Sequence, residues 1–390
     1  MSGQRPLEGV RVVSLEHYIA GPYCTQLLVD GGAEVIKVER PDGGDPRRSY
    51  DPQWTRGDET VSGGFLSYNR GKKSVTADLS DPDDHAALDG LIDTADVLVS
   101  NFRPGMLAAH GLDPLEIQRK RRRLVACEIS GFGREGPYAD WPAFDTVIQA
   151  MSGLASLLGQ SEEGPPGLAP MGTSDLLAGT FAALGILMAL VGRGTSGEGT
   201  HLDVAMYDVT AAFLERPLTL YETTSQVPRR GEDRFSPVGA FRTGDGGWVA
   251  LVIPTDAHWR RCCRAIGRED LVEDPELDTV LKRSAAMQDR VIPVLEAWGA
   301  SLDQHEAAAR LRDAGQPAGT VQAIDEVRSC PQLDVRGLFA PVADPVTDRP
   351  GTGPLRLPRL PLNPSTWRVT SGRSPRLGEH NAELFGWRSG

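Results

Sequence analysis

The sequence predicts an α/β protein in which a doubly wound parallel sheet forms a large domain and a smaller α+β domain follows it. Short β-branched runs alternate with helical patterns through about the first 130 residues, which is the order that builds right-handed strand–helix–strand units. From about residue 229 the pattern changes to a hairpin and amphipathic helices. A length of 390 residues fits two or three domains at roughly 100–200 residues each.

The first part of the chain supplies five expected strands separated by helices and turns. The strands are expected at Val10–Leu15, Ala33–Glu39, Ser74–Leu79, Asp96–Ser100 and Leu124–Ile129. Helices are expected at Pro22–Asp30, from Pro82 to about Ala95, and from Pro104 onward. Each strand is a short apolar run rich in branched residues, and the first helix stops at a pair of glycines.

The rest of the chain adds two long helices, a strand and the smaller domain. Helices are expected at about Asp145–Leu158 and Asp175–Val191, and a strand at His201–Met206. In the smaller domain we expect a hairpin at Gly239–Thr243 and Trp248–Ile253, with helices near Ala257–Ile266, Ala285–Trp298 and Gln304–Ala314. Beyond about Leu333 the chain is rich in proline and is expected to be irregular.

Composition and charge exclude several classes of protein. The chain has 41 Lys and Arg against 53 Asp and Glu, a net charge of −12, which disfavours nucleic acid or an anionic membrane as the main partner. Its 5 cysteines contain no CxxC pair and its 7 histidines no zinc-ligand spacing, so we expect a reducing, cytoplasmic setting and no metal. The N-terminus lacks the apolar stretch of a signal peptide. The uncharged run Leu176–Gly192 is shorter than the about 20 residues that a bilayer needs, and it predicts a helix buried in a protein core.

Phosphate-binding motifs are missing, although basic residues gather in the first hundred or so positions. The turn after the first strand reads EHYIAGPY, which lacks GxGxxG, and no GxxxxGK[ST] occurs, so NAD and ATP are disfavoured. The basic residues are Lys37, Arg40, Arg47, Arg48, Arg70, Lys72, Lys73 and Arg103. Many follow strand ends, where α/β sheets place ligands, and a ligand with several phosphates would fit them. Ion pairing with Glu39, Asp42 and Asp45 is the other interpretation, and charge counting leaves both open.

Asp175 is the most informative carboxylate in the sequence. It follows a Gly-Thr-Ser loop and opens the long apolar helix, where unpaired backbone N–H groups and the helix dipole favour an anion. Such an aspartate is either an ordinary N-cap or, because a short glycine-containing loop precedes a helix predicted to be buried, a group that a substrate can approach. GxSxG is absent, and His17, His201 and His380 are interpreted as structural because none has a partner visible in the sequence.

Seven segments, spread in order along nearly the whole chain, resemble a known family. They read PLEGVRVVSLEHYIAGPYCTQLLVDGGAEVIKVERPDGGDPRR, NRGKKSVTADL, DVLVSNFRPGMLAAHGL, ISGFGREGPY, GTSDLLAGTFAALGILMAL, FRTGDGGWVAL and LGEHNAELFGW. On these segments the chain resembles the class III coenzyme A transferases, the CaiB/BaiF family, which includes formyl-CoA transferase, carnitine CoA-transferase and the α-methylacyl-CoA racemases. One such string is weak evidence, whereas seven in the family's order are highly specific.

The resemblance implies a Rossmann-like large domain at residues 1–225, a small α+β domain at 226–330 and a C-terminal segment at 331–390 that returns to the large domain. It also implies a homodimer of two interlocked, ring-shaped chains. The expected reaction moves coenzyme A from an acyl-CoA thioester to a carboxylic acid through an aspartyl-CoA thioester. Coenzyme A and acyl-CoA are then substrates, and no metal or tightly bound cofactor is expected.

Carried over residue by residue, the resemblance makes Asp175 the nucleophile and Asp145 a second acid near the thioester. We expect Asp175 to be ionised at neutral pH because the helix terminus favours the anion. Contacts to coenzyme A are expected at Ile19, Ala20, Arg40, Ala77, Asp78, Leu79, Ser80, Asn101, Phe102 and Arg103.

The sequence also departs from the family pattern at several positions. Ala109 and Pro142 replace basic residues of formyl-type relatives, so we expect other phosphate contacts, with His110 or Arg70 as candidates. Ile19 replaces a glutamine, and the run of consecutive glycines is absent between residues 229 and 239, which disfavours an oxalate–formate substrate. Phe144 replaces the proton-transferring histidine of the racemases. An acyl-CoA racemase, disfavoured by that change, and a non-catalytic CoA-ester-binding protein are the alternatives.

Overall fold

The computed structural model describes residues 3–159, 164–230, 237–344, 346–347, 354–369 and 372–386. They form two compact units. The large unit comprises the described residues of Met1–Ala155, Leu168–Leu218 and Pro331–Gly390, and the small unit those of Ser156–Gly167 and Thr219–Cys330.

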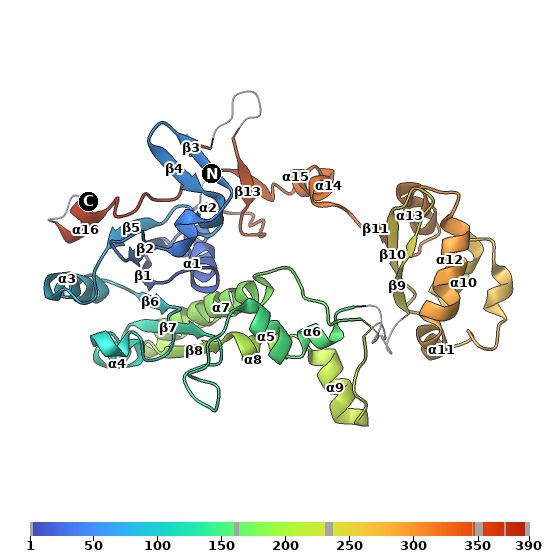
Figure 1. Ribbon diagram of the computed structural model, residues 1–390, viewed down its shortest axis with the longest axis horizontal. Coiled ribbons are helices and arrows are strands. Elements are labelled where there is room, and N and C mark those ends of the chain that lie inside the picture. The colour runs from blue at the N-terminus through green and yellow to red at the C-terminus, as the bar shows by residue number, and fades with distance from the viewer. Residues whose placement is uncertain are drawn as a thin grey trace. The chain divides into compact units, whose positions relative to one another are not determined.

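A parallel sheet of six strands organises the large unit (Figure 1). The strands are β1 (Arg11–Leu15), β2 (Glu34–Glu39), β5 (Lys73–Thr76), β6 (Val97–Ser100), β7 (Val125–Ser130) and β8 (His201–Ala205). Their order across the sheet is β5-β2-β1-β6-β7-β8, and every neighbouring pair is parallel. The predicted α/β fold with a parallel sheet is therefore confirmed. The strand order reverses between β1 and β6, and such reversal points are where open α/β sheets bind ligands.

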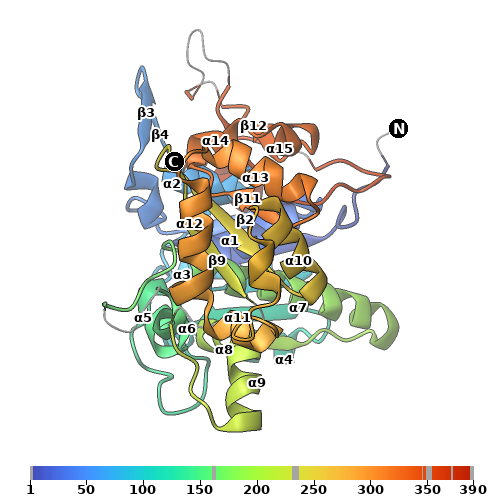
Figure 2. The same cartoon turned by 90° about the vertical axis from the view of Figure 1, so that its right-hand side faces the viewer.

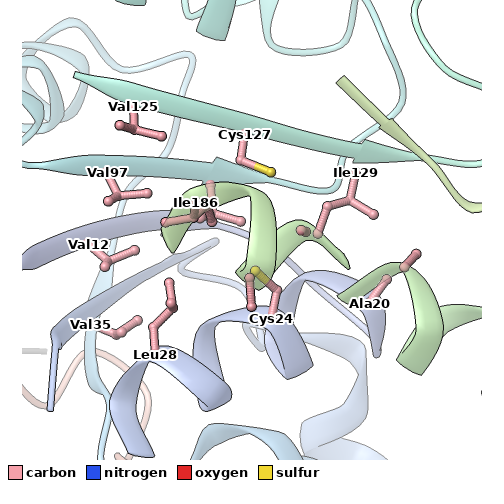
Figure 3. Close-up of a cluster of buried hydrophobic side chains, with 14 of the residues drawn as sticks. Val12, Ala20, Cys24, Leu28, Val35, Val97, Val125, Cys127, Ile129 and Ile186 are labelled. Carbon is pink, nitrogen blue, oxygen red and sulfur yellow. The ribbon is translucent and has the colours of Figure 1, made fainter. Parts of the chain in front are cut away.

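Alternate residues of each strand point to opposite faces, and helices cover both faces. Val12 faces the core beneath α1 (Ala20–Asp30) and α7 (Thr173–Ser196), whereas Val13 faces the core on the opposite side. Figure 3 shows the first core, in which Ile186 of α7 lies against residues of β1, β6 and β7. Helices α3 (Pro82–Asp93) and α4 (Pro114–Lys120) contribute to the second core. Burial on both faces explains why the central strands β1, β6 and β7 consist mostly of apolar residues.

Small residues let α1 and α7 pack closely. Ala178, Ala182 and Ile186 form a buried stripe at helical spacing on α7. A Cβ at Gly179 would lie 2.7 Å from the carbonyl oxygen of Ala20, so only glycine fits there. This contact fixes the second turn of α7 against the first turn of α1.

Two predicted helices differ from those observed. No helix starts at Pro104, because Gly105 and Gly111 have φ of +82° and +71°, and α4 begins at Pro114 instead. Asp113 caps α4 by accepting a hydrogen bond from the Leu115 N–H at 2.9 Å. The helix predicted at about 145–158 is divided into α5 (Asp145–Met151) and α6 (Leu154–Leu157).

Several short elements of the large unit were not predicted. These are the 3-10 turn η1 (Pro46–Ser49), the hairpin β3 (Gln53–Arg56) and β4 (Glu59–Ser62), α2 (Gly63–Asn69), η2 (Ala108–His110) and α8 (Met206–Ala212). Helix α9 (Glu215–Thr224) runs across the division between the two units. The hairpin strands are polar and mostly exposed, so they lack the apolar alternation that marks a strand.

The C-terminal segment lies along the outer edge of strand β5. The Ser74 N–H donates to Nδ1 of His380 at 3.2 Å, and the His380 N–H donates to the Ser74 carbonyl at 2.9 Å. The Thr76 N–H donates to Oδ1 of Asn381 at 2.8 Å, at the start of α16 (Asn381–Phe385). Other elements near this end of the chain are α14 (Ile324–Arg328), α15 (Pro331–Val335), β12 (Phe339–Pro341) and β13 (Arg356–Pro358).

The small unit is a three-stranded antiparallel sheet with helices packed against it. The order is β11-β10-β9, with β9 at Val238–Arg242, β10 at Trp248–Val252 and β11 at Ala318–Thr320. Its helices are α10 (Asp256–Ala265), α11 (Val280–Ala285), the π-helix η4 (Met287–Val291), α12 (Ile292–Gly299) and α13 (Gln304–Asp313), besides the short 3-10 turn η3 (Glu269–Val272). Figure 2 looks onto α10 and α12, whose side chains pack with Phe241 and Leu251 in one core. The predicted hairpin forms, and β11 is an addition.

Candidate active site

A cavity of about 540 Å³ opens at the carboxyl ends of β1, β6 and β7, where the strand order reverses. Its walls come from segments far apart in the sequence. Residues that follow β1 and β6 meet the loop before α5 and the start of α7. The lining includes His17, Tyr18, Ile19, Ala20, Arg47, Tyr50, Asn101, Phe102, Arg103, Ser130, Gly131, Trp141, Phe144, Asp145, Met171, Asp175 and Met206.

The loop that follows β1 is held in an unusual shape. Tyr18 has φ of +63°, which a residue with a side chain seldom adopts, so neighbouring groups must hold it there. Asn101 clamps the loop from both sides: its Oδ1 accepts from the His17 N–H at 2.9 Å, and its Nδ2 donates to the His17 carbonyl at 2.7 Å. The Tyr18 N–H donates to Asp45 at 3.3 Å. Burial lowers the pKa of His17 to about 4, so its ring is neutral in the cavity wall.

A buried network of charged side chains stabilises this loop. The Lys37 ammonium lies 2.9 Å from the Asp45 carboxylate, and it donates to the Glu16 carbonyl at 2.9 Å. The Lys72 ammonium lies 2.8 Å from the Glu16 carboxylate. Burial would lower the pKa of Lys37, but the charges of Asp45 and Glu16 outweigh it and raise that pKa. Burial lowers the pKa of Lys72 to about 8.

Most of the basic residues that could have bound phosphate are therefore occupied within the protein. Both lysines of the network are completely buried, Arg48 pairs with Glu39 at 2.7 Å, and Lys73 pairs with Glu34 at 2.8 Å. For these residues the ion-pairing interpretation is correct. Arg70 was a candidate phosphate contact, and this is wrong: its guanidinium donates to the backbone carbonyls of Leu66, Ser67 and Pro358 and lines a separate cavity.

Asp175 lies in the first turn of α7, at the cavity wall. The helix begins at Thr173 after Gly172, so Asp175 is its third residue and not its N-cap. The pKa of Asp175 is raised to about 7, chiefly by burial and in addition by the Asp145 charge, while Arg47 and the Ala20 N–H act in the opposite direction. Only part of the Asp175 carboxyl is therefore ionised at neutral pH, whereas the sequence predicts ionisation there. Loss of water around the carboxylate outweighs the helix terminus.

Asp145 holds the first turn of α7 in place through hydrogen bonds. One carboxylate oxygen accepts from the Ser174 N–H at 2.6 Å, and the other accepts from the Gln149 amide at 2.7 Å. Gln149 in turn accepts from the Ala169 N–H at 2.8 Å. Asp145 thus ties α5 to the loop and the helix that carry Asp175.

The structure brings together some of the residues expected to contact coenzyme A and leaves others outside the cavity. Ile19, Ala20 and residues 101–103 line the cavity with both aspartates. Arg40 and residues 77–80 follow β2 and β5 at the same edge of the sheet, outside the lining. Arg40 donates to the Gly44 carbonyl at 3.1 Å and lies 3.6 Å from Asp42. His110, the other candidate phosphate contact, is also outside the lining, and its carbonyl accepts from the His85 ring at 2.8 Å.

The sequence reasoning missed the aromatic and thioether side chains of the cavity. Tyr18, Tyr50, Trp141, Met171 and Met206 all line it. Except for Met206, which begins α8, they come from loops without periodic pattern, so the sequence gives no signal for them. Together they make the wall around Asp175 largely apolar.

Helix α7 is apolar on all sides, but the described chain buries only one of them. By length and composition this is a helix that could cross a membrane, and 28% of its apolar window is buried. The outer face carries Phe181, Leu184, Met188 and Val191, which are between 41% and 77% exposed. The prediction of a helix buried all round is therefore wrong within one chain.

Comparison with known proteins gives consistent matches along the whole chain. Residues 7–381 match the family described as CoA-transferase family III. Succinate–glutarate CoA-transferase from Agrobacterium fabrum is 33% identical over 388 residues, which are 97% of this chain and 95% of that protein. Succinyl-CoA–D-citramalate CoA-transferase from Chloroflexus aurantiacus is 34% identical over 395 residues, 99% of this chain and 95% of that protein.

Solved structures agree with the sequence comparison. The crystal structure of a CaiB/BaiF family protein from Brucella suis has a TM-score of 0.85 at 29% identity and covers 98% of both chains. The structure of Rv3272 from Mycobacterium tuberculosis has a TM-score of 0.84 at 32% identity and covers 98% of this chain and 100% of that one.

Proposed function

The chain belongs to CoA-transferase family III, and on this premise we propose that it transfers coenzyme A from an acyl-CoA to a carboxylic acid through a covalent intermediate on Asp175. Relatives named for succinyl-CoA and acetyl-CoA support a donor thioester with a short acyl group. The alternative of a binding protein without turnover loses its support, because the matching relatives are named as transferases.

The state of Asp175 is the observation that carries the proposal. Its carboxyl lies in a largely apolar cavity, and among the described residues no cation lies within ion-pair distance of it. A carboxylate without a salt bridge and with little water is a stronger nucleophile than one in solution. The Ala20 N–H faces the same carboxyl and can stabilise negative charge there.

The reaction proceeds by four exchanges at carbonyl carbons. The Asp175 carboxylate attacks the donor thioester, the C–S bond breaks, and an anhydride and the CoA thiolate form. The thiolate attacks the aspartyl carbonyl of the anhydride, which gives aspartyl-CoA thioester and releases the donor acid. The acceptor carboxylate attacks this thioester, giving a second anhydride and the thiolate. The thiolate then attacks the acceptor carbonyl, forming the new acyl-CoA and restoring Asp175. Each step exchanges one acyl bond for another, so no external energy source is needed.

We propose that coenzyme A lies across the carboxyl edge of this doubly wound, Rossmann-like sheet. Residues 19–20 and 101–103 would contact the pantetheine end, because they line the cavity beside Asp175. Arg103 is exposed at the cavity rim, where it can meet the phosphates. Arg40 and residues 77–80 would extend this surface along the ends of β2 and β5.

The exposed face of α7 supports a homodimer. Apolar side chains in a continuous helical stripe are seldom left in water, and a second copy of the chain would cover them. The interlocked ring arrangement and a cytoplasmic location stay predictions from the family resemblance.

Trapping the intermediate tests the proposal. Incubation with succinyl-CoA should add the mass of coenzyme A, less one water, to the wild-type chain in intact-protein mass spectrometry. Asp175→Ala should show neither the adduct nor turnover, while binding of coenzyme A stays within a few-fold of wild type. Asp140→Ala, which removes an aspartate from the loop before α5, is a matched control and should keep the adduct. Turnover by Asp175→Ala would remove this residue from the mechanism.

The racemase alternative is not supported by the cavity wall. Phe144 lies beside Asp145 in the lining, where a proton-transferring group would be required. A phenyl ring has no exchangeable proton at any accessible pH. The neutral ring of His17 also lines the cavity, and a neutral imidazole can accept a proton. Proton exchange at the α-carbon of a substrate should therefore be measured directly.

A further inference from the structure

Two arginines line the cavity, and the structure leaves both without an ion pair among the described residues. Arg103 lies on the side where the proposed coenzyme A enters. Arg47 lies in η1, on the side of Tyr50. Its neighbour Arg48 differs, because Glu39 neutralises it at 2.7 Å.

The Arg47 guanidinium is held in place by uncharged groups. Its Nε donates to the Gly64 carbonyl at 2.8 Å, and its central carbon lies 5.2 Å from the Tyr68 ring centre and 5.5 Å from that of Tyr50. The backbone is fixed as well, because the Arg47 N–H donates to Asp45 at 3.0 Å. The remaining nitrogens therefore stay available on a rigid side chain in the cavity wall.

A cation that has no ion pair and borders a largely apolar cavity favours the binding of an anion. Arg47 and Asp175 line the same cavity, yet they form no ion pair. An anion between them would need to present a carboxylate to Arg47 and a carbonyl carbon to Asp175. A dicarboxylic acid bound as a thioester at one end has both groups in one small molecule.

We propose that Arg47 binds the free carboxylate of a dicarboxylic acyl group, and so selects dicarboxylic over monocarboxylic substrates. The inference rests on the proposed transfer reaction and adds its substrate class. Arginine suits this role because its planar guanidinium group forms two parallel hydrogen bonds with a carboxylate. The same contact would hold the donor acyl group and the acceptor acid in turn, since both must reach Asp175.

Matched pairs of acceptors test the proposal. Succinate and butyrate have the same chain length and differ in the second carboxylate, as do glutarate and valerate. For the wild type, kcat/KM should be at least about 10-fold higher for the dicarboxylate of each pair. Arg47→Gln should lower kcat/KM for succinate by about 10- to 100-fold, mainly through KM, and change the value for butyrate by less than about 3-fold.

Further variants separate this role from a structural one. Arg47→Lys keeps the charge and should recover part of the succinate activity, without the full bidentate contact. Arg119→Gln, which removes an exposed arginine of α4, should leave both acceptors unchanged. If Arg47→Gln does not fold, the proposal is still tested by the wild-type ratio of kcat/KM for succinate to kcat/KM for butyrate, and by the same ratio in Arg47→Lys.

Two results would overturn the inference and leave the transfer reaction intact. One is a wild-type enzyme that uses butyrate as well as succinate. The other is an equal loss of both activities in Arg47→Gln with a shifted pH profile, which would mean that Arg47 acts only on Asp175. Failure of the transfer reaction itself would look different, because neither acceptor nor the mass adduct would then be seen.

Discussion

Replacing Asp175 by asparagine should remove the activity and, above neutral pH, make the protein more stable. Asparagine keeps the size of the side chain and an oxygen that can accept from the Ala20 N–H, but it cannot ionise. The variant therefore isolates the cost of holding a negative charge in the cavity wall.

The size of the gain follows from the pKa of Asp175. Its pKa rises from 3.8 to about 7 on folding, chiefly because the carboxylate is buried. At ~1.4 kcal/mol per pKa unit, this rise of about 3 corresponds to ~4 kcal/mol. Between these two pKa values the folded chain holds a proton that the unfolded chain has lost, so wild-type stability falls as pH rises through this window.

Urea unfolding of both proteins, at one protein concentration and at several pH values, measures the difference. The free energy of unfolding of Asp175→Asn minus that of wild type should be near zero at about pH 4 and approach ~4 kcal/mol at about pH 8. Asp58→Asn, an exposed change in the β3–β4 turn, controls for loss of a surface charge. A difference that stays constant with pH, or a wild type that is the more stable at about pH 8, would refute the reasoning.

Three further changes probe the groups around Asp175. Asp145→Asn should move the acidic limb of the kcat profile to lower pH, because the Asp145 charge raises the pKa of Asp175; an unmoved limb would contradict this. Gly172→Ala should cost about 1–2 kcal/mol of stability and reduce kcat, since φ is +94° there and the new methyl would lie 3.3 Å from Ile19. The matched change Gly197→Ala, at the other end of α7 with φ of +77° and open space, should cost similar stability but leave kcat unchanged, as denaturation and steady-state assays will show. A chiral 2-methylacyl-CoA incubated with the enzyme in deuterated water should show no exchange at its α-carbon by mass spectrometry, because Phe144 cannot carry a proton; rapid exchange would restore the racemase alternative.

The sheet could be predicted because its strands are buried on both faces. Runs such as Val10–Leu15 consist mostly of branched apolar residues, interrupted there by Arg11 and Ser14, and this gives a signal that needs no knowledge of the neighbouring strands. The polar strands β3 and β4 carry no such signal, and the loops of the cavity carry none either. For the same reason the aromatic wall around Asp175 could not be found in advance.

The charges of the site could be located in the sequence but not interpreted. Lys37 and Lys72 follow the pattern of a phosphate-binding cluster, yet their partners Asp45 and Glu16 become neighbours only through the fold. The protonation of Asp175 depends on burial and on Asp145, which is 30 residues away in the chain. Helix periodicity likewise cannot say whether a neighbouring chain is needed to cover α7.

The C-terminal segment has a consequence for how the chain can be shortened. Strand β5 is the last strand on its side of the sheet, and the backbone N–H groups of Ser74 and Thr76 are satisfied by His380 and Asn381. An uncovered outer strand is a template on which other chains add strands. Removing the final residues from His380 onward should therefore cause aggregation before it impairs catalysis, and an affinity tag is better fused at the opposite terminus.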